Sequence, residues 1–290
     1  MSISLANNSY GKSQIRLLKL RRQPDRHDVK DLTLDIRFEG DFESCYLYGD
    51  NTRILPTDTI KNTAYAFAKL YSIDQIEEFG RTLAEHFLTD NPQISKVQVK
   101  VAENVWNRVA YGAKPHASTF MAAGGQQRTA TVTATRDGVT IQAGVENLDL
   151  MRTAGAGFEN YIHDPFTTLP EMEERVLATT ASVEWTYSQN DIPFGAYWHG
   201  ACEALFQTFT EHDSKSAQHT LYAMANAVLE RYEEISEISI AMPAKHCVLV
   251  DLSPFGLDNN NEVFVPAEEP YATIKATVRR EEDEEADEDL

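Results

Sequence analysis

The 290-residue chain lacks long apolar runs, because its hydrophobic residues are spread along the sequence. No segment approaches the run of about 18 apolar residues that a membrane-spanning helix requires. The first residues, MSISLANNSYGK, also lack the basic and apolar regions of a signal peptide. With 42% hydrophobic and 10% aromatic residues, the chain has enough apolar material for one large domain or two ordinary ones. We therefore expect a soluble, cytoplasmic protein with no membrane partner.

Cysteine and metal-binding motifs are also scarce. The three cysteines, Cys45, Cys202 and Cys247, are an odd number without CxxC spacing, which argues against a disulfide framework or a zinc ribbon and favours buried apolar roles. The eight histidines are scattered singly, and no HExxH, P-loop or GxSxG motif occurs. GAGFEN (155–160) begins like a dinucleotide loop but has Asn160 where the third glycine belongs. We expect chemistry that uses neither a metal nor a bound cofactor.

Positive charge is in short supply, since 26 lysines and arginines face 45 aspartates and glutamates, for a net charge of -19. Eight of the acids lie in EEDEEADED, residues 281–289. Such a block of like charge favours a disordered, solvated tail, so we assign residues 281–290 to a tail. The same charge balance excludes nucleic acids and anionic membranes as expected partners.

The chain contains a regular succession of strand-like and helical hydrophobic periodicities. Residues 10–22 and 32–38 have the alternation typical of two half-buried antiparallel strands. From Asp58 the period becomes helical, and a second helical pattern follows; the apolar positions of the two helices are Ile60, Ala64, Phe67 and Tyr71, then Ile76, Phe79, Leu83 and Phe87. Strand patterns return at 97–101 and 130–134, and Asp137-Gly138 predicts a hairpin turn.

The second half repeats this order. It has strand patterns at 139–145 and 182–187, helical patterns over roughly 196–232, and a strand at EISEISIAM. An offset of 141 residues aligns apolar positions of the two halves, pairing Leu83 with Met224, Ala84 with Ala225, Phe87 with Val228, Leu88 with Leu229, Ile94 with Ile235, Val97 with Ile238 and Val99 with Ile240. The pattern indicates a tandem duplication of a strand-strand-helix-helix-strand-strand unit.

This organisation predicts an α+β fold in which antiparallel sheets carry helices on one face. We place the first domain at residues 1–137 and the second at 138–280. The uncovered sheet face requires a cover, and joining of sheets between subunits into a closed barrel would provide it and also remove exposed edges.

The stretch LPTDTIKN (55–62) begins the first long helix. Thr57 and Asp58 are residue types that accept hydrogen bonds from free amides at a helix start, so a cap is the simplest interpretation. The first turn of a helix also carries positive partial charge that suits an anionic ligand. A cap and a ligand site are therefore compatible at this helix start.

Five segments spread over both halves resemble one family. The chain resembles the urate oxidases (uricases), cofactor-independent enzymes of purine breakdown, in YGKSQIRLLK (10–19), LPTDTIKN (55–62), YIHDPFTTLPEMEER (161–175), AKHCVLVDL (244–252) and NNNEVFVP (259–266). The resemblance implies two tandem T-fold (tunnelling-fold) domains and a homotetramer built around a tunnel, with active sites at subunit interfaces. The implied partners are urate and dioxygen, and the implied products are 5-hydroxyisourate and hydrogen peroxide.

The resemblance also implies roles for residues of the second half. Arg175 and Gln218 would clamp urate, because a guanidinium fork and an amide can each form paired hydrogen bonds with a purine edge. Phe158 would stack on the purine face, and the Ala217 backbone amide and the Leu177 side chain would complete the pocket. Taken one at a time, each of these residues could equally be a surface ion pair, an exposed polar group or ordinary core.

Residues of both halves would supply the catalytic group. By resemblance, Thr57 and Asp58 reach the ligand from a neighbouring subunit. Lys12 would activate the Thr57 hydroxyl and His246 would shuttle the proton, so that bound urate loses a proton and becomes able to reduce dioxygen. Without the family context, Lys12 would be assigned as an exposed strand lysine and His246 as a structural histidine.

One position departs from the family. Urate oxidases usually have Asn-Lys-His where this chain has Ala244-Lys245-His246, and that asparagine holds water or dioxygen above the ligand. Its replacement leaves open a compensated enzyme, a slowed oxygen step, or a urate-binding or purine-binding T-fold assembly with impaired catalysis. A different tunnelling-fold enzyme acting on a pterin or purine is disfavoured, because no suitably spaced cysteine and histidine set for zinc occurs.

Overall fold

The computed structural model describes residues 3–112 and 114–281. The chain forms two compact units, which we describe separately. Unit 1 comprises residues 1–148 and 189–198, and unit 2 comprises residues 149–188 and 199–290. Apart from Glu281, the acidic tail predicted at 281–290 lies outside the described residues.

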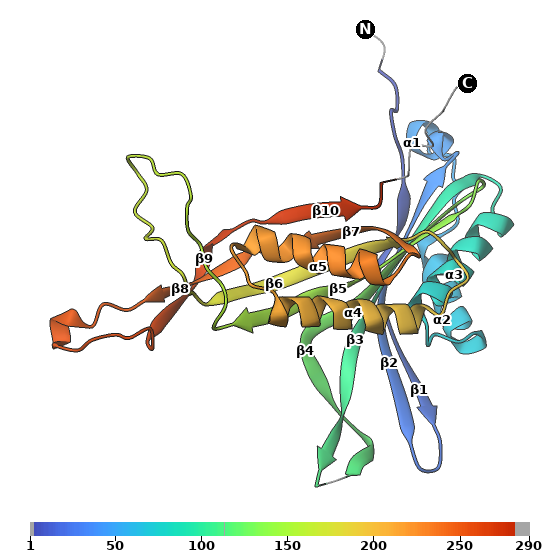
Figure 1. The fold of residues 1–290 in the computed structure, drawn as a ribbon. Coiled ribbons are helices and arrows are strands. Elements are labelled where there is room, and N and C mark those ends of the chain that lie inside the picture. Colours follow the sequence, from blue (N-terminus) through green and yellow to red (C-terminus); the bar gives the residue numbers. More distant parts are fainter. Residues whose placement is uncertain (1–2, 113, 282–290) are drawn as a thin grey trace, which may run out of the picture. The chain divides into compact units, whose positions relative to one another are not determined.

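Unit 1 is an antiparallel sheet with helices on one face (Figure 1). Its strands, in sheet order, are β1 (Tyr10–Arg22), β2 (His27–Gly40), β3 (Ile94–Tyr111), β4 (Lys114–Thr135) and β5 (Val139–Arg152), whose last residues belong to unit 2. Its helices are α1 (Glu43–Tyr48), α2 (Thr57–Leu70) and α3 (Ile76–Asp90). Thr135 donates its amide hydrogen to the Gly138 carbonyl at 2.9 Å, which confirms the predicted Asp-Gly turn between β4 and β5.

The core of unit 1 lies between this sheet and its helices. The alternate residues of β2, from Leu32 to Phe38, are buried, and α3 packs against β3 and β4. An ion pair between Arg128 of β4 and Glu77 of α3, at 2.7 Å and buried on both sides, fixes the start of that helix. The prediction that Tyr71 shares the buried face of α2 is wrong: the helix ends at Leu70, the backbone turns extended, and Tyr71 is exposed.

Unit 2 repeats the plan with an added arm. Its elements are β6 (Leu177–Tyr187), α4 (Phe194–Glu211, which begins in unit 1), α5 (Ala217–Arg231), β7 (Ile235–Ala241), β8 (Ala244–Leu249), η1 (Ser253–Phe255), β9 (Phe264–Ala272) and β10 (Lys275–Arg279). Strand β7 lies between β6 and β10, and α5 packs against β7 and β10. Strands β8 and β9 pair with each other and extend beyond β6 as an arm (Figure 1). The sequence patterns did not predict β10 or this arm.

The tandem duplication is supported by burial. All fourteen aligned apolar positions at the 141-residue offset are buried, and they lie on α3 and β3 in unit 1 and on α5 and β7 in unit 2. The same helix-then-strand step therefore forms the core of each unit, as the offset predicts.

The three cysteines differ in burial. Cys202 is buried as expected, but Cys45 and Cys247 are only half-buried, because α1 buries no residue and β8 belongs to the arm. Among the described residues, no helix combines the length and apolar character needed to cross a membrane.

Candidate active site

The predicted site residues fall into two groups, one in each unit. Unit 1 carries Lys12, Thr57 and Asp58, and unit 2 carries the other predicted residues, which are Phe158, Arg175, Leu177, Ala217, Gln218, Ala244 and His246. Each group is described within its own unit.

The capping role predicted for Thr57 and Asp58 is wrong. The residue at the N-cap of α2 is Pro56, no side chain caps the helix, and Thr57 is its first residue. The Asp58 carboxylate instead accepts hydrogen bonds from the side chains of Lys61 and Asn62, at 2.5 and 2.9 Å. The Pro56 ring restricts φ (−55°), its ψ of 137° makes the entry to the helix extended, and the Thr57 hydroxyl caps no amide.

Lys12 lies where β1 is irregular. The register with β2 shifts between Lys12 and Ile15, and Gln14 adopts a positive φ of 56° while its amide donates to Asp35 at 2.7 Å. Such a bulge changes the direction of nearby side chains. Lys12 is half-buried and close enough to Asp58 to contribute to the lowered pKa of that carboxyl, which is due first to the hydrogen bond from Lys61. Strand β1 also packs against α2, so Lys12 and the start of α2 lie in the same part of unit 1.

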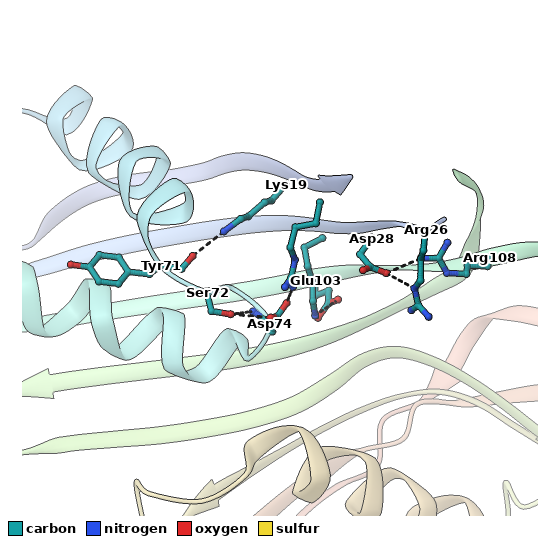
Figure 2. Close-up of polar contacts among 10 residues, drawn as sticks. Lys19, Arg26, Asp28, Tyr71, Ser72, Asp74, Glu103 and Arg108 are labelled. Carbon is teal, nitrogen blue, oxygen red and sulfur yellow. Dashed lines mark hydrogen bonds and ion pairs between the residues drawn. The ribbon is translucent and has the colours of Figure 1, made fainter. Parts of the chain in front are cut away.

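A polar cluster anchors the far end of α2 to the sheet (Figure 2). Lys19 of β1 donates to the Tyr71 carbonyl just after α2, at 2.9 Å, and Arg21 pairs with Asp74 in the connection to α3. Farther along the sheet, Asp28 pairs with Arg108 of β3 at 2.7 Å (Figure 2). The Lys19 and Arg21 contacts hold the C-terminal end of α2 against β1. They therefore also limit how far Thr57, at the other end of α2, can move relative to Lys12.

In unit 2, Phe158 and Arg175 lie together. The Arg175 guanidinium sits over the Phe158 ring, 5.1 Å from its centroid. The Arg175 amide donates to Ala156 at 2.7 Å, and Phe158 exchanges two backbone hydrogen bonds with Met172. These bonds hold the two segments side by side, so the Arg175 guanidinium and the Phe158 ring lie at one place, where the Tyr161 ring also stacks on Phe158 with centroids 4.7 Å apart.

Arg175 has unused hydrogen-bonding capacity. Its Nε is buried, and no described residue accepts its hydrogen. Burial lowers the pKa of the Arg175 guanidinium. A desolvated guanidinium N–H without an acceptor is costly, whereas an anionic ligand would satisfy it.

The start of α5 lies beside the segment that carries Phe158. Ser216 caps this helix by accepting the His219 amide hydrogen at 3.1 Å, and Ala217 and Gln218 are its first two residues. Ala217 is buried and Gln218 is exposed. Backbone bonds from Ser214 to Gly155 (3.1 Å) and from Gly157 to Ser214 (2.8 Å) join this helix start to the Phe158 segment.

Leu177 and Ala244 meet through strand pairing. Leu177 begins β6 and is buried, and two residues on, Thr179 is the Cα partner of Ala244 in β8. Opposite residues of an antiparallel pair share a face, so Leu177, Thr179 and Ala244 lie on one face. Lys245 lies on the other, where it pairs with Asp149 at 3.1 Å. His246 is exposed on β8, two residues from Ala244.

Sequence reasoning missed three residues beside the clamp. Arg152 donates to the carbonyls of Ala154, Phe209 and His212 and so joins the end of β5 to the end of α4. The ring centroids of His212 and His219 are 4.3 Å apart, a contact that the spacing of the two residues along the chain did not indicate. Among the described residues, no group of three or more metal-ligating side chains occurs.

Comparison with known proteins finds relatives over nearly the whole chain. The uricase family model matches residues 8–133 and 141–275, which are two segments in tandem. The uricase of Arthrobacter globiformis is 37% identical over 279 residues, covering 96% of this chain and 91% of that protein. The chain belongs to the uricase family. The rabbit (Oryctolagus cuniculus) uricase is 33% identical over 285 residues, covering 96% of this chain and 95% of that uricase.

Solved uricase structures share the fold. The crystal structure of Arthrobacter globiformis uricase matches with a TM-score of 0.93 over 97% of this chain and 96% of that chain, at 37% identity. A urate oxidase mutant from Bacillus sp. TB-90 matches with a TM-score of 0.82 over 94% of this chain and 99% of that chain, at 22% identity, which shows the fold alone. The predicted α+β class with two tandem T-fold repeats is confirmed by these matches to uricases.

Proposed function

We propose that this chain oxidises urate with dioxygen and water to 5-hydroxyisourate and hydrogen peroxide, in purine breakdown and without a cofactor. Urate gives up two electrons and gains a hydroxyl from water with net loss of two protons, and dioxygen takes up the two electrons and two protons. The main support is Arg175, whose buried Nε has no acceptor among the described residues while its guanidinium lies over Phe158. A flat anion with hydrogen-bond acceptors at its edge fits both features.

In this proposal the two residue groups have different tasks. Arg175, Gln218 and the Ala217 amide hold the purine edges, Phe158 stacks on its face, and Leu177 lines the pocket. Lys12, Thr57 and His246 form the proton relay, and Asp58 contacts the ligand beside Thr57. Two observations support this relay: strand β1, which carries Lys12, packs against α2, which begins at Thr57, and the Thr57 hydroxyl caps no helix amide.

Oxygen uptake tests the assignment and its specificity. Purified protein in air should consume oxygen when urate is added, and xanthine at the same concentration should give none. Xanthine lacks the third carbonyl, so buried clamp groups would be left unpaired. Uptake with xanthine but not urate would exclude the proposal.

The proposed assembly is a homotetramer of two-domain chains, divided at 137/138, in the cytoplasm. The arm of unit 2 supports self-association, because it exposes several large apolar residues, which are Val248, Leu249, Phe255, Leu257, Val263 and Val265. We expect sedimentation to give four times the 32.6 kDa chain mass. Replacing Phe255 and Leu257 by serine should shift the protein toward smaller species; a wild-type monomer would contradict the assembly.

Ala244 provides a test of the oxygen step. Ala244→Asn places an amide on the face shared with Thr179, whose buried hydroxyl has no partner among the described residues. We expect kcat to rise by about a hundredfold, because a preorganised donor at a reacting centre has an effect of that order, with urate affinity unchanged. Steady-state kinetics measure this, with Ala276→Asn on exposed β10 as the control. Equal turnover would show that Ala244 is already compensated.

A further inference from the structure

The turn between α4 and α5 is held by a pair of histidines that the proposed mechanism does not use. His212 Nε2 and His219 Nδ1 are 3.2 Å apart, and the Lys215 amide points at the same His219 Nδ1 at 3.4 Å. An amide can only donate, so the geometry requires His219 Nδ1 to be an acceptor. His212 Nε2 must then carry the hydrogen that it shares with His219. The arrangement exists only while His219 Nδ1 is unprotonated.

Backbone hydrogen bonds join this turn to the segment that leads into Phe158, and Arg175 bonds to the same segment. Within the turn, Ser214 bonds to Gly155 and Gly157, which lead into Phe158. Ala156 of the same segment accepts the Arg175 amide hydrogen at 2.7 Å. The turn ends at the cap of α5, directly before Ala217 and Gln218. A shift of the turn would therefore move the stacking ring, the guanidinium and the amide relative to one another.

We propose that His219 is a positioning residue for substrate binding, which holds the start of α5 against the Phe158 segment only in its unprotonated form. This inference rests on the proposed function. Protonation would place a hydrogen on Nδ1, facing two other donors, so both bonds would be lost. The expected consequence is weaker urate binding in acid, through displacement of Gln218 and Ala217.

The surrounding groups disfavour a proton on His212. Burial, followed by the neighbouring His219 and Arg152, lowers the pKa of His212, and Asp213 opposes this. The remaining charged group of the turn, Lys215, pairs with Asp213 at 2.6 Å and is also close to Glu159. Arg152, which donates to the His212 carbonyl from β5, thus disfavours a positive charge on the His212 ring.

Anaerobic urate binding tests the proposal, because without oxygen turnover does not contribute. The dissociation constant of the wild-type protein for urate should rise by about tenfold between pH 8 and pH 5.5, the size expected for loss of a hydrogen bond near the ligand. His219→Asn keeps an oxygen acceptor near the Nδ1 position but cannot be protonated. It should bind as wild type at pH 8 and show little change with pH.

Two further variants complete the experiment. His219→Leu removes the acceptor and should bind urate about tenfold more weakly at every pH. His86→Asn removes a histidine of α3 in unit 1, which pairs with Asp90 at 3.1 Å, and should keep the wild-type pH profile. A wild-type profile in His219→Asn, or a flat wild-type profile, would overturn this inference alone. Failure of wild-type protein to bind urate at pH 8 would overturn the proposed function as well.

Discussion

Lys12→Met should lower kcat by about a thousandfold and leave the anaerobic urate dissociation constant within about twofold of wild type. The lysine is proposed to take the proton that the Thr57 hydroxyl passes on, and removal of a positioned general base has effects of this order. It touches none of the clamp residues of unit 2 in our proposal, so binding should persist. Stopped-flow and steady-state kinetics separate the two quantities.

The matched control is Lys100→Met, which removes an exposed lysine from β3 in the same unit. Its kcat should equal that of the wild-type protein. If Lys12→Met keeps wild-type turnover, or if its loss lies wholly in urate binding, Lys12 does not act in proton transfer.

Arg175→Leu should lower kcat/KM by about a thousandfold without lowering the melting temperature. Two charge-assisted hydrogen bonds to the ligand together correspond to about 4 kcal/mol. In the free protein the same residue is a partly desolvated cation whose Nε has no acceptor in the described chain, so leucine relieves a cost. Activity and stability should therefore change independently.

Arg152→Leu serves as the control, because this replacement is expected to lower the melting temperature. Arg152 donates to three backbone carbonyls, so its loss leaves acceptors unpaired at the end of α4 and should lower the melting temperature. Equal destabilisation by both replacements would assign Arg175 a structural role and contradict the clamp.

Most of the fold follows from periodicity because each buried face repeats at a fixed interval. The 141-residue offset aligned α3 and β3 with α5 and β7, and all of the aligned residues are buried. Both halves bury apolar surface at matching positions, so an apolar pattern that recurs at a fixed offset indicates a duplication. The arm formed by β8 and β9 escaped prediction because its apolar residues are exposed and follow no buried face.

Local chemistry was less predictable at the helix starts. Thr57 looked like a cap from its residue type, but the preceding Pro56 sets the backbone entry and the Asp58 carboxylate prefers the Lys61 and Asn62 side chains. At α5 a serine does act as the cap, through Ser216. Residue type gives the capacity for a hydrogen bond, whereas the backbone geometry decides which partner is used.

The site itself depends on contacts between distant segments. Family resemblance identified Phe158 and Arg175, but their cation–π contact requires the bridge between Phe158 and Met172. His212 and His219 meet because the chain turns between two helices, and neither spacing nor composition specifies that turn. Long-range backbone bonding of this kind is why single histidines in a sequence can form a pair in the fold.

The proposed reaction is tested most simply by mixing the purified protein with urate in air, without added metal, and following urate absorbance and peroxide together. We expect urate to disappear and one hydrogen peroxide to form for each urate consumed. Urate that remains unchanged over hours, or that disappears without peroxide, would contradict it.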